Sequence, residues 1–255
     1  MVYRRPMHLD RIALQLYTVR EAAAVDLAAT LHAVRAAGYR AVELAGLPDI
    51  APATLAGLLA EADLRPIASH EGIVALRNDV EAVGERLTSL GIGRAIVPWM
   101  PDADRATLDD VRRFADELRG IAAVLAQRGI RLGYHNHAFE FAPIEETTVW
   151  DVLLERLAPD VDLELDVYWA ALAGRDPVAL IDELGGRVRS LHMKDMSAGS
   201  DPLDAPAGEG VLAFPEIVAA GRAAGVEWYI AEQDHARAPL DDIARAYRYL
   251  ASLAS

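Results

Sequence analysis

The sequence predicts a single α/β domain that folds as a closed (β/α)₈ TIM barrel. The chain has 255 residues, close to the roughly 250 residues in which such a barrel closes. Short apolar runs alternate with longer segments of helical periodicity from end to end, which is typical of a parallel sheet built from βα units. Eight such pairs are present, and no GxGxxG pattern follows the first strand, which argues against an open nucleotide-binding sheet. We therefore expect one domain over residues 1–255.

Each expected strand is a short apolar segment that precedes a helical one. The strands are expected at Ile12–Tyr17, Ala41–Leu44, Pro66–His70, Ala95–Pro98, Arg131–His137, Asp162–Val167, Arg189–Met193 and Trp228–Glu232. The helices are expected at Leu27–Ala37, Pro52–Ala62, Val74–Leu90, Arg105–Arg128, Val149–Leu157, Pro177–Leu184, Pro215–Ala224 and Leu240–Leu253. Gly38, Gly91, Gly129 and Gly225 follow helical segments, where a residue that adopts positive φ ends a helix at little cost.

Composition excludes several classes of function. The chain has 25 basic and 39 acidic residues, a net charge of −14, and such a surface repels the phosphates of nucleic acid. It has no cysteine, so any metal must be held by His, Asp or Glu. No apolar run approaches the ~18 residues of a membrane span, and no signal-peptide pattern follows the N-terminal arginines. We expect a soluble cytoplasmic protein without nucleic-acid or membrane partners.

Ionisable residues stand at the ends of four consecutive strands, where the function of a barrel gathers. Side chains alternate along a strand, so each of these strands presents two of them on one face. One such residue alone is more often structural, but burying so many without a metal or substrate is costly. Together they predict an O/N-ligand cage suited to Mn²⁺, Mg²⁺, Co²⁺ or Zn²⁺. The pairs are His135 with His137, Glu164 with Asp166, His192 with Lys194, and Glu232 with Asp234.

Four other residues are weaker candidates for substrate binding. Glu43 and His70 follow the second and third strands, where they either meet a polyhydroxylated ligand or satisfy backbone groups at the barrel mouth. Trp99 is either a wall for a sugar ring or part of the core. Glu209 lies in the segment PAGEG, which is either a loop that closes over the site or a plain turn.

Several motifs along the whole chain resemble one known family. They are IALQLYTVR (12–20), GYRAVELAG (38–46), GYHNHAFEF (133–141), LELDVYWA (163–170), LHMKD (191–195), GEGVLAFPEI (208–217) and AEQD (231–234). They are similar to the xylose-isomerase-like TIM barrels known as sugar phosphate isomerases/epimerases, which include inosose dehydratases and 3-keto-sugar lyases. GYHNHAFEF and LHMKD are fairly specific to one branch, whereas the others are generic.

The resemblance implies a divalent metal, with Mn²⁺ preferred, held by Glu140, Asp166, His192 and Glu232. Many relatives place the first glutamate directly at the end of strand five. Here that position is His135, so His135 is the alternative ligand to Glu140.

The resemblance also implies an isomerase or epimerase of carbohydrate metabolism that removes a proton next to a carbonyl through a metal-stabilised enediolate. Glu232 or His137 would move the proton, with His135 as the other candidate histidine. Lys194, the only lysine in the chain, would neutralise an alkoxide, bind a hydroxyl, or form a salt bridge to a carboxylate.

Two other functions stay open at this point. A lyase or dehydratase acting on a 3-keto-glycoside or keto-inositol begins with the same proton abstraction. A non-catalytic sugar-binding barrel is less favoured, because it has no need of four convergent ligands. In each case the partner is a small sugar, keto-sugar or cyclitol, and assembly into a homo-oligomer is left open.

Overall fold

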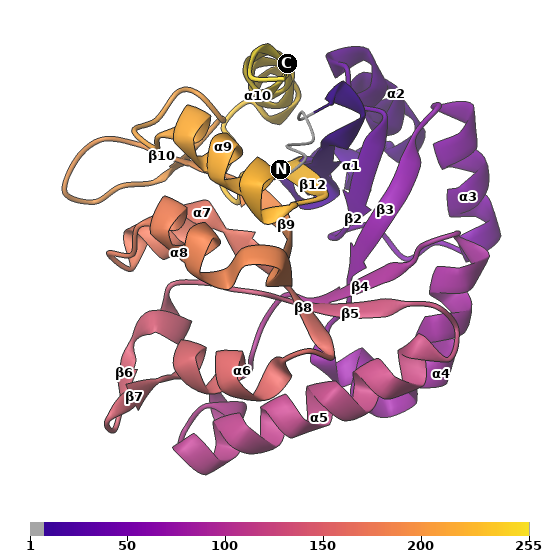
Figure 1. The fold of residues 1–255 in the computed structure, drawn as a ribbon. Coiled ribbons are helices and arrows are strands. Elements are labelled where there is room, and N and C mark those ends of the chain that lie inside the picture. The colour runs from indigo at the N-terminus through magenta and orange to yellow at the C-terminus, as the bar shows by residue number, and fades with distance from the viewer. Residues whose placement is uncertain (1–7, 255) are drawn as a thin grey trace.

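Eight parallel strands form a closed barrel in the computed structural model, which describes residues 8–254 (Figure 1). The order around the barrel is β1-β12-β9-β8-β5-β4-β3-β2, and each neighbouring pair is parallel. The predicted fold is therefore confirmed. The barrel strands are β1 (Ile12–Gln15), β2 (Ala41–Leu44), β3 (Arg65–His70), β4 (Arg94–Val97), β5 (Arg131–His135), β8 (Val161–Asp166), β9 (Val188–Met193) and β12 (Trp228–Ala231).

Helices surround the barrel, and their starts follow from side-chain caps. Helix α5 begins at Leu108 rather than at the expected Arg105, because the Thr107 hydroxyl accepts the N–H of Asp110. None of the described helices is long and apolar enough to cross a lipid bilayer. The helices are α1 (Arg20–Val25), α2 (Leu27–Ala37), α3 (Pro52–Glu61), α4 (Ile73–Ser89), α5 (Leu108–Ala126), α6 (Val149–Leu157), α7 (Val167–Leu172), α8 (Pro177–Leu184), α9 (Phe214–Ala224) and α10 (Pro239–Ser252).

The short helices α1 and α7 were not expected from the sequence. Helix α7 starts directly after β8, because the Asp166 carboxylate accepts the N–H of Trp169 and so caps the helix. Val167, expected to end the strand, is therefore the first helical residue. This cap brings the α7 residue Trp169 close to the barrel mouth.

Two small antiparallel sheets decorate the loops above the barrel. One pairs β6 (Pro143–Ile144) with β7 (Thr147–Thr148), and the other pairs β10 (Asp195–Met196) with β11 (Asp204–Ala205). The Asp195 carboxylate accepts the N–H groups of Gly208, Gly210 and Leu212 and so fastens the loop that follows β11. A Cβ on Gly210 would lie 2.3 Å from Asp195 Oδ1, so this close approach needs glycine.

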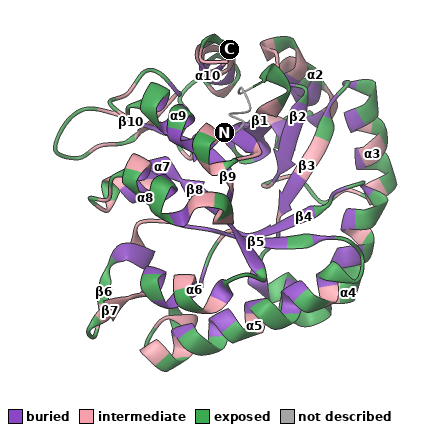
Figure 2. Cartoon of the chain, in the orientation of Figure 1, coloured by how far each residue is buried: buried purple, intermediate pink, exposed green. Residues whose placement is uncertain are grey.

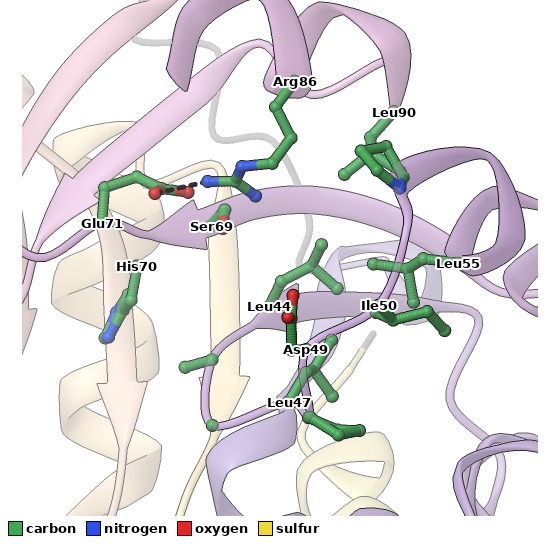
Figure 3. A pocket seen from close by; sticks show the side chains of 14 residues that line it. Leu44, Leu47, Asp49, Ile50, Leu55, Ser69, His70, Glu71, Arg86 and Leu90 are labelled. Carbon is green, nitrogen blue, oxygen red and sulfur yellow. Dashed lines mark hydrogen bonds and ion pairs between the residues drawn. The ribbon is translucent and has the colours of Figure 1, made fainter. Parts of the chain in front are cut away.

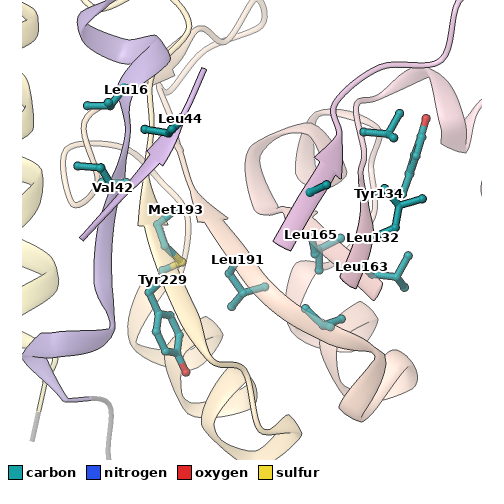
Figure 4. Close-up of a cluster of buried hydrophobic side chains, with 14 of the residues drawn as sticks. Leu16, Val42, Leu44, Leu132, Tyr134, Leu163, Leu165, Leu191, Met193 and Tyr229 are labelled. Atoms are coloured by element: carbon teal, nitrogen blue, oxygen red, sulfur yellow. The ribbon is translucent and has the colours of Figure 1, made fainter. Parts of the chain in front are cut away.

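The main apolar core lies between the barrel and its helices (Figure 2). Figure 4 shows part of it, where Leu163, Leu191 and Tyr229 project from neighbouring strands toward the helix layer. A separate small cluster joins side chains of β1, β2 and β12. It consists of Ala13, Ala41, Trp228 and Ile230. Because strand side chains alternate, these residues point into the barrel and form an apolar floor below the polar residues at the strand ends.

Candidate active site

A buried polar layer lies above the apolar floor and centres on His192. Its Nε2 lies 2.8 Å from Glu43 Oε2 and 2.9 Å from Glu164 Oε1. Its Nδ1 lies 2.7 Å from Glu232 Oε2. Burial lowers the pKa of His192, but the carboxylates of Glu164 and Glu232 outweigh this effect and hold the pKa well above its usual value. The imidazole is thus fixed from both sides by carboxylates of three different strands.

The first two of these carboxylates have further partners that fix them in place. Gln15 Nε2 donates to Glu43 Oε2 at 2.9 Å, and the Ser190 hydroxyl donates to Glu164 Oε2 at 2.7 Å. His70 Nε2 lies 2.9 Å from Glu164 Oε1 and 3.3 Å from Glu43 Oε2. Burial lowers the pKa of His70, but these two carboxylates raise it overall to about 10. The layer is therefore a connected network of His and Glu side chains.

A group of four side chains from β5, β8, β9 and the end of β12 offers ligand atoms that lie within 4.8 Å of one another. All four are buried: His135, Asp166, His192 and Glu232. Asp166 uses Oδ1 for the helix cap, whereas its buried Oδ2 makes no hydrogen bond within residues 8–254. Two imidazole nitrogens and two carboxylate oxygens suit a divalent ion. These residues therefore fit a metal ion. A second group, His70, His135, Glu164 and His192, meets the same distance criterion.

Lys194 supplies a buried positive charge beside this group. Its Nζ lies 3.1 Å from Asp166 Oδ2, 3.1 Å from Glu232 Oε2 and 2.7 Å from Asp234 Oδ2. Burial lowers the pKa of Lys194, but the three carboxylates hold it well above its ordinary value. The ammonium group is therefore charged, and the salt bridge expected as one of its roles is present.

Glu140 lies apart from the ligand group. The Tyr134 hydroxyl donates to its Oε1 at 2.7 Å, and the backbone N–H of His137 donates to its Oε2 at 2.7 Å. Its carboxylate thus folds back onto the turn that follows β5, and both oxygens are engaged there. Burial raises the pKa of Glu140 to about 7. The place beside Asp166 and His192 that the resemblance gave to Glu140 is taken by the alternative, His135.

A cavity of about 360 Å³ opens above the ligand group. His137 forms part of its wall, with its ring centroid 4.9 Å from that of Trp99 and 5.2 Å from that of Trp169. Burial and the neighbouring His135 lower the pKa of His137 to about 2, so its imidazole is neutral. Its buried Nδ1 has no hydrogen-bond partner in the described part of the chain. The cavity is lined by Tyr17, Ala45, Gly46, His70, Pro98, Trp99, His135, His137, Glu232 and Asp234.

The structure brings most of the weaker candidates to the site. Glu43 and His70 belong to the buried polar layer, and Trp99, with 43% of its surface exposed, borders the cavity. Glu209 does not line the cavity, because its carboxylate pairs with Arg245 of α10 at 2.5 Å. The loop fastened by Asp195 turns Glu209 toward this helix.

Sequence reasoning gave no role to several residues of the site. Glu164 and Asp234 were placed on the correct strand faces, but only the folded barrel brings Glu164 to His70 and Asp234 to Lys194. Gln15 gave no separable signal, because a lone glutamine at a strand end is common. Tyr17 follows the same strand, and its place in the cavity wall was likewise not predicted.

Comparison with known proteins gives the family. A family model described as xylose isomerase-like TIM barrel matches residues 31–253. The chain belongs to the xylose isomerase-like TIM-barrel family. Members of this family process sugars, and the fold and the resemblance read from the sequence agree with it.

Individual relatives are more distant. Inosose dehydratase of Lacticaseibacillus casei is 25% identical over 170 residues, which are 58% of this chain and 56% of that protein. The chain thus spans little more than half the length of the curated relatives it matches. Among solved structures, a sugar phosphate isomerase/epimerase from Parabacteroides distasonis superposes with a TM-score of 0.82 at 21% identity over 96% of this chain and 95% of that one. The probable 3-DHS dehydratase of petrobactin synthesis from Bacillus anthracis gives 0.73 at 13% identity, over 94% and 98%.

Proposed function

We propose that this protein is a divalent-metal-dependent enzyme that removes a proton next to the carbonyl of a sugar, keto-sugar or cyclitol. The observation that carries the proposal is the convergence of His135, Asp166, His192 and Glu232 at the base of an aromatic-walled cavity. A purely structural network has no reason to leave Asp166 Oδ2 buried without a hydrogen bond, because that costs stability. The mixed nitrogen and oxygen donors favour Mn²⁺, with Mg²⁺, Co²⁺ or Zn²⁺ as alternatives.

A divalent ion held here would supply a Lewis acid for the substrate carbonyl. Glu232 is the proposed proton acceptor. Its Oε2 is held by His192 and Lys194, whereas its Oε1 makes no hydrogen bond with residues 8–254 and the side chain lines the cavity. Holding one carboxylate oxygen leaves the other oriented toward the carbon that loses its proton.

The cavity wall positions the substrate. The neutral His137 ring accepts a hydrogen bond from a substrate hydroxyl at its free Nδ1, since no protein group competes for that atom in the described chain. Trp99 offers an exposed aromatic face to the C–H groups of a sugar ring. Lys194 keeps Asp166, Glu232 and Asp234 together, so that the site stays assembled before the substrate arrives.

The step after proton removal separates two candidate reactions. An isomerase or epimerase returns the proton to a neighbouring carbon or to the opposite face, whereas a dehydratase or lyase expels a hydroxyl or glycosyl oxygen. We put isomerisation or epimerisation first. The dehydratase stands as the second candidate because a relative with detectable sequence similarity is an inosose dehydratase.

The metal is tested with matched carboxylate variants. Elemental analysis after purification with Mn²⁺ should find one ion in the wild type, strongly reduced metal in Asp166→Asn and Glu232→Gln, and wild-type metal in Glu140→Gln. Glu140 is the matched control because it is an equally buried carboxylate outside the ligand group. A wild-type protein without bound metal, or equal metal in all three variants, contradicts the assignment.

The reaction is tested in D₂O with a 3-keto-sugar and a keto-inositol. Deuterium should enter the carbon next to the carbonyl in the presence of Mn²⁺, and EDTA should prevent it. Retention of mass apart from the label identifies an isomerase or epimerase, and loss of water or of the glycosyl group identifies the dehydratase or lyase. Exchange that is equal with and without metal contradicts a metal-dependent enzyme.

A further inference from the structure

A second cavity, of about 310 Å³, lies beside the candidate active site. It sits against the ends of β2 and β3 and is bordered by α3 and α4 (Figure 3). Ala45, Gly46 and His70 line both cavities, so the two are separated only by a thin wall. Gly46 has a φ of +64°, and a Cβ on it would lie 2.8 Å from the Tyr17 ring. Glycine is required at this part of the shared wall.

Polar groups with unused hydrogen-bonding capacity line the second cavity. Glu71 is 4% exposed, and Arg86 donates to its Oε2 at 2.5 Å (Figure 3). Its buried Oε1 has no hydrogen-bond partner within residues 8–254. The hydroxyl of Ser69, a buried residue two positions earlier, likewise makes no hydrogen bond in that range. A buried carboxylate oxygen is costly without a donor, so this cavity is suited to a molecule that brings one.

The charges of this cavity select a neutral ligand. The only cation that lines it, Arg86, is already paired with Glu71, and the lining includes a further carboxylate, Asp49. A phosphate or carboxylate would face an uncompensated Glu71 oxygen and be repelled. A hydroxyl group instead donates to Glu71 Oε1. Leu44 and Leu55 in the same wall suit the C–H groups of a sugar ring.

We propose that the second cavity binds a neutral glycosyl unit linked to the sugar that reacts in the first cavity, so that the substrate is a two-ring glycoside. The inference rests on the proposed function for the occupant of the first cavity. Each cavity lies near the lower end of the size range of small-molecule sites, which suits one ring apiece. His70 stands between them, anchored by Glu164 and Glu43, and faces the linkage.

The test compares one-ring and two-ring ligands on the Mn²⁺-loaded protein by isothermal titration calorimetry. The ligands are methyl glucoside, cellobiose and maltose, which lack the keto group and so bind without turnover. At least one disaccharide should bind about tenfold more tightly than methyl glucoside, a difference of about 1.4 kcal/mol. Leu55→Trp and Leu47→Trp should each fill the second cavity and remove this gain, while leaving the affinity for methyl glucoside unchanged.

Leu58→Trp is the matched control, because Leu58 lies on the same helix as Leu55 but does not line the cavity. It should keep the gain. Leu47 lies in a loop rather than in an element, so its variant remains informative if Leu55→Trp fails to fold. Equal affinity for one and two rings in the wild type, or a gain that survives in the folded cavity variants, overturns the inference. If methyl glucoside still binds only with metal, the proposed function stands without it. If no sugar binds to the loaded protein, both fall together.

Discussion

The ammonium group of Lys194 lies 3.1 Å from Asp166 Oδ2, and both residues are buried. The same ammonium lies 3.1 Å from Glu232 Oε2. A cation therefore already stands beside two of the carboxylates proposed to hold the metal. In the metal-free protein it compensates charges that would otherwise be buried unpaired.

Lys194→Met should therefore destabilise the metal-free protein more than the metal-loaded one. Removing one partner of a buried ion pair costs about 3–5 kcal/mol, and a bound Mn²⁺ ion replaces part of the lost positive charge. Urea denaturation in EDTA and in Mn²⁺ measures the two losses. Arg112→Met, which removes an exposed pair with Asp109, should cost at most about 1 kcal/mol in either condition. Equal losses for Lys194→Met with and without metal would refute this role.

His137→Asn should keep the metal and lower turnover. The variant loses the imidazole that orients a substrate hydroxyl, and a displaced substrate reacts on the order of 10²-fold more slowly. His135→Asn should instead lose the metal, since His135 belongs to the group of ligand atoms. Metal content and kcat/KM of both variants decide the matter. Metal loss in His137→Asn with full retention in His135→Asn would mean that the two histidines exchange roles.

Glu140 should make the stability of the protein depend on pH. Burial raises its pKa from a usual value near 4.5 to about 7. The folded state therefore binds the proton more tightly than the unfolded state. This contribution to stability is full below about pH 4.5 and is lost as the pH rises through 7. From the shift, the loss is up to roughly 3 kcal/mol.

Glu140→Gln should remove this dependence. The difference in unfolding free energy between wild type and variant, measured in EDTA between pH 5 and 8, isolates the contribution of Glu140. Glu146→Gln, which changes an exposed carboxylate nearby, is the control and should follow the wild type. A difference that stays constant over this pH range, or that moves in favour of the wild type as the pH rises, would disprove the assignment.

Trp99→Ala should raise KM about tenfold and leave the metal content unchanged. An aromatic face that packs against a ring contributes about 0.5–1.5 kcal/mol beyond its buried area, and Trp99 borders the cavity without contributing a ligand atom. Leu172→Ala, another partly exposed apolar residue, should leave KM as it is. An unchanged KM in Trp99→Ala would show that this wall does not contact the substrate.

The fold was predictable from the sequence because alternation of apolar strands and amphipathic helices is a local property. Each barrel strand found in the structure overlaps an expected segment. The small β6–β7 and β10–β11 sheets were not predicted, because two-residue strands leave no periodic signal. The short helix α7 was missed for a similar reason: its start depends on the Asp166 cap rather than on an apolar pattern.

The site was predictable only where a strand alone sets the direction of a side chain. Asp166 and His192 come together because both lie within barrel strands and pair in register. Glu140 lies in the turn beyond β5, where backbone geometry decides which way the carboxylate points, and spacing along the chain does not contain that information. The contact between His70 and Glu164 crosses the barrel from β3 to β8, and only closure of the sheet brings it about.

The apolar floor of the barrel has a consequence for traffic through the enzyme. Trp228, Ile230 and the small residues beside them fill the lower interior, so the reaction chamber is a blind-ended well. Whatever is formed at its base must depart by the route through which the reactant arrived. While it remains there, the next molecule has to wait, so the product is expected to be a competitive inhibitor of its own formation.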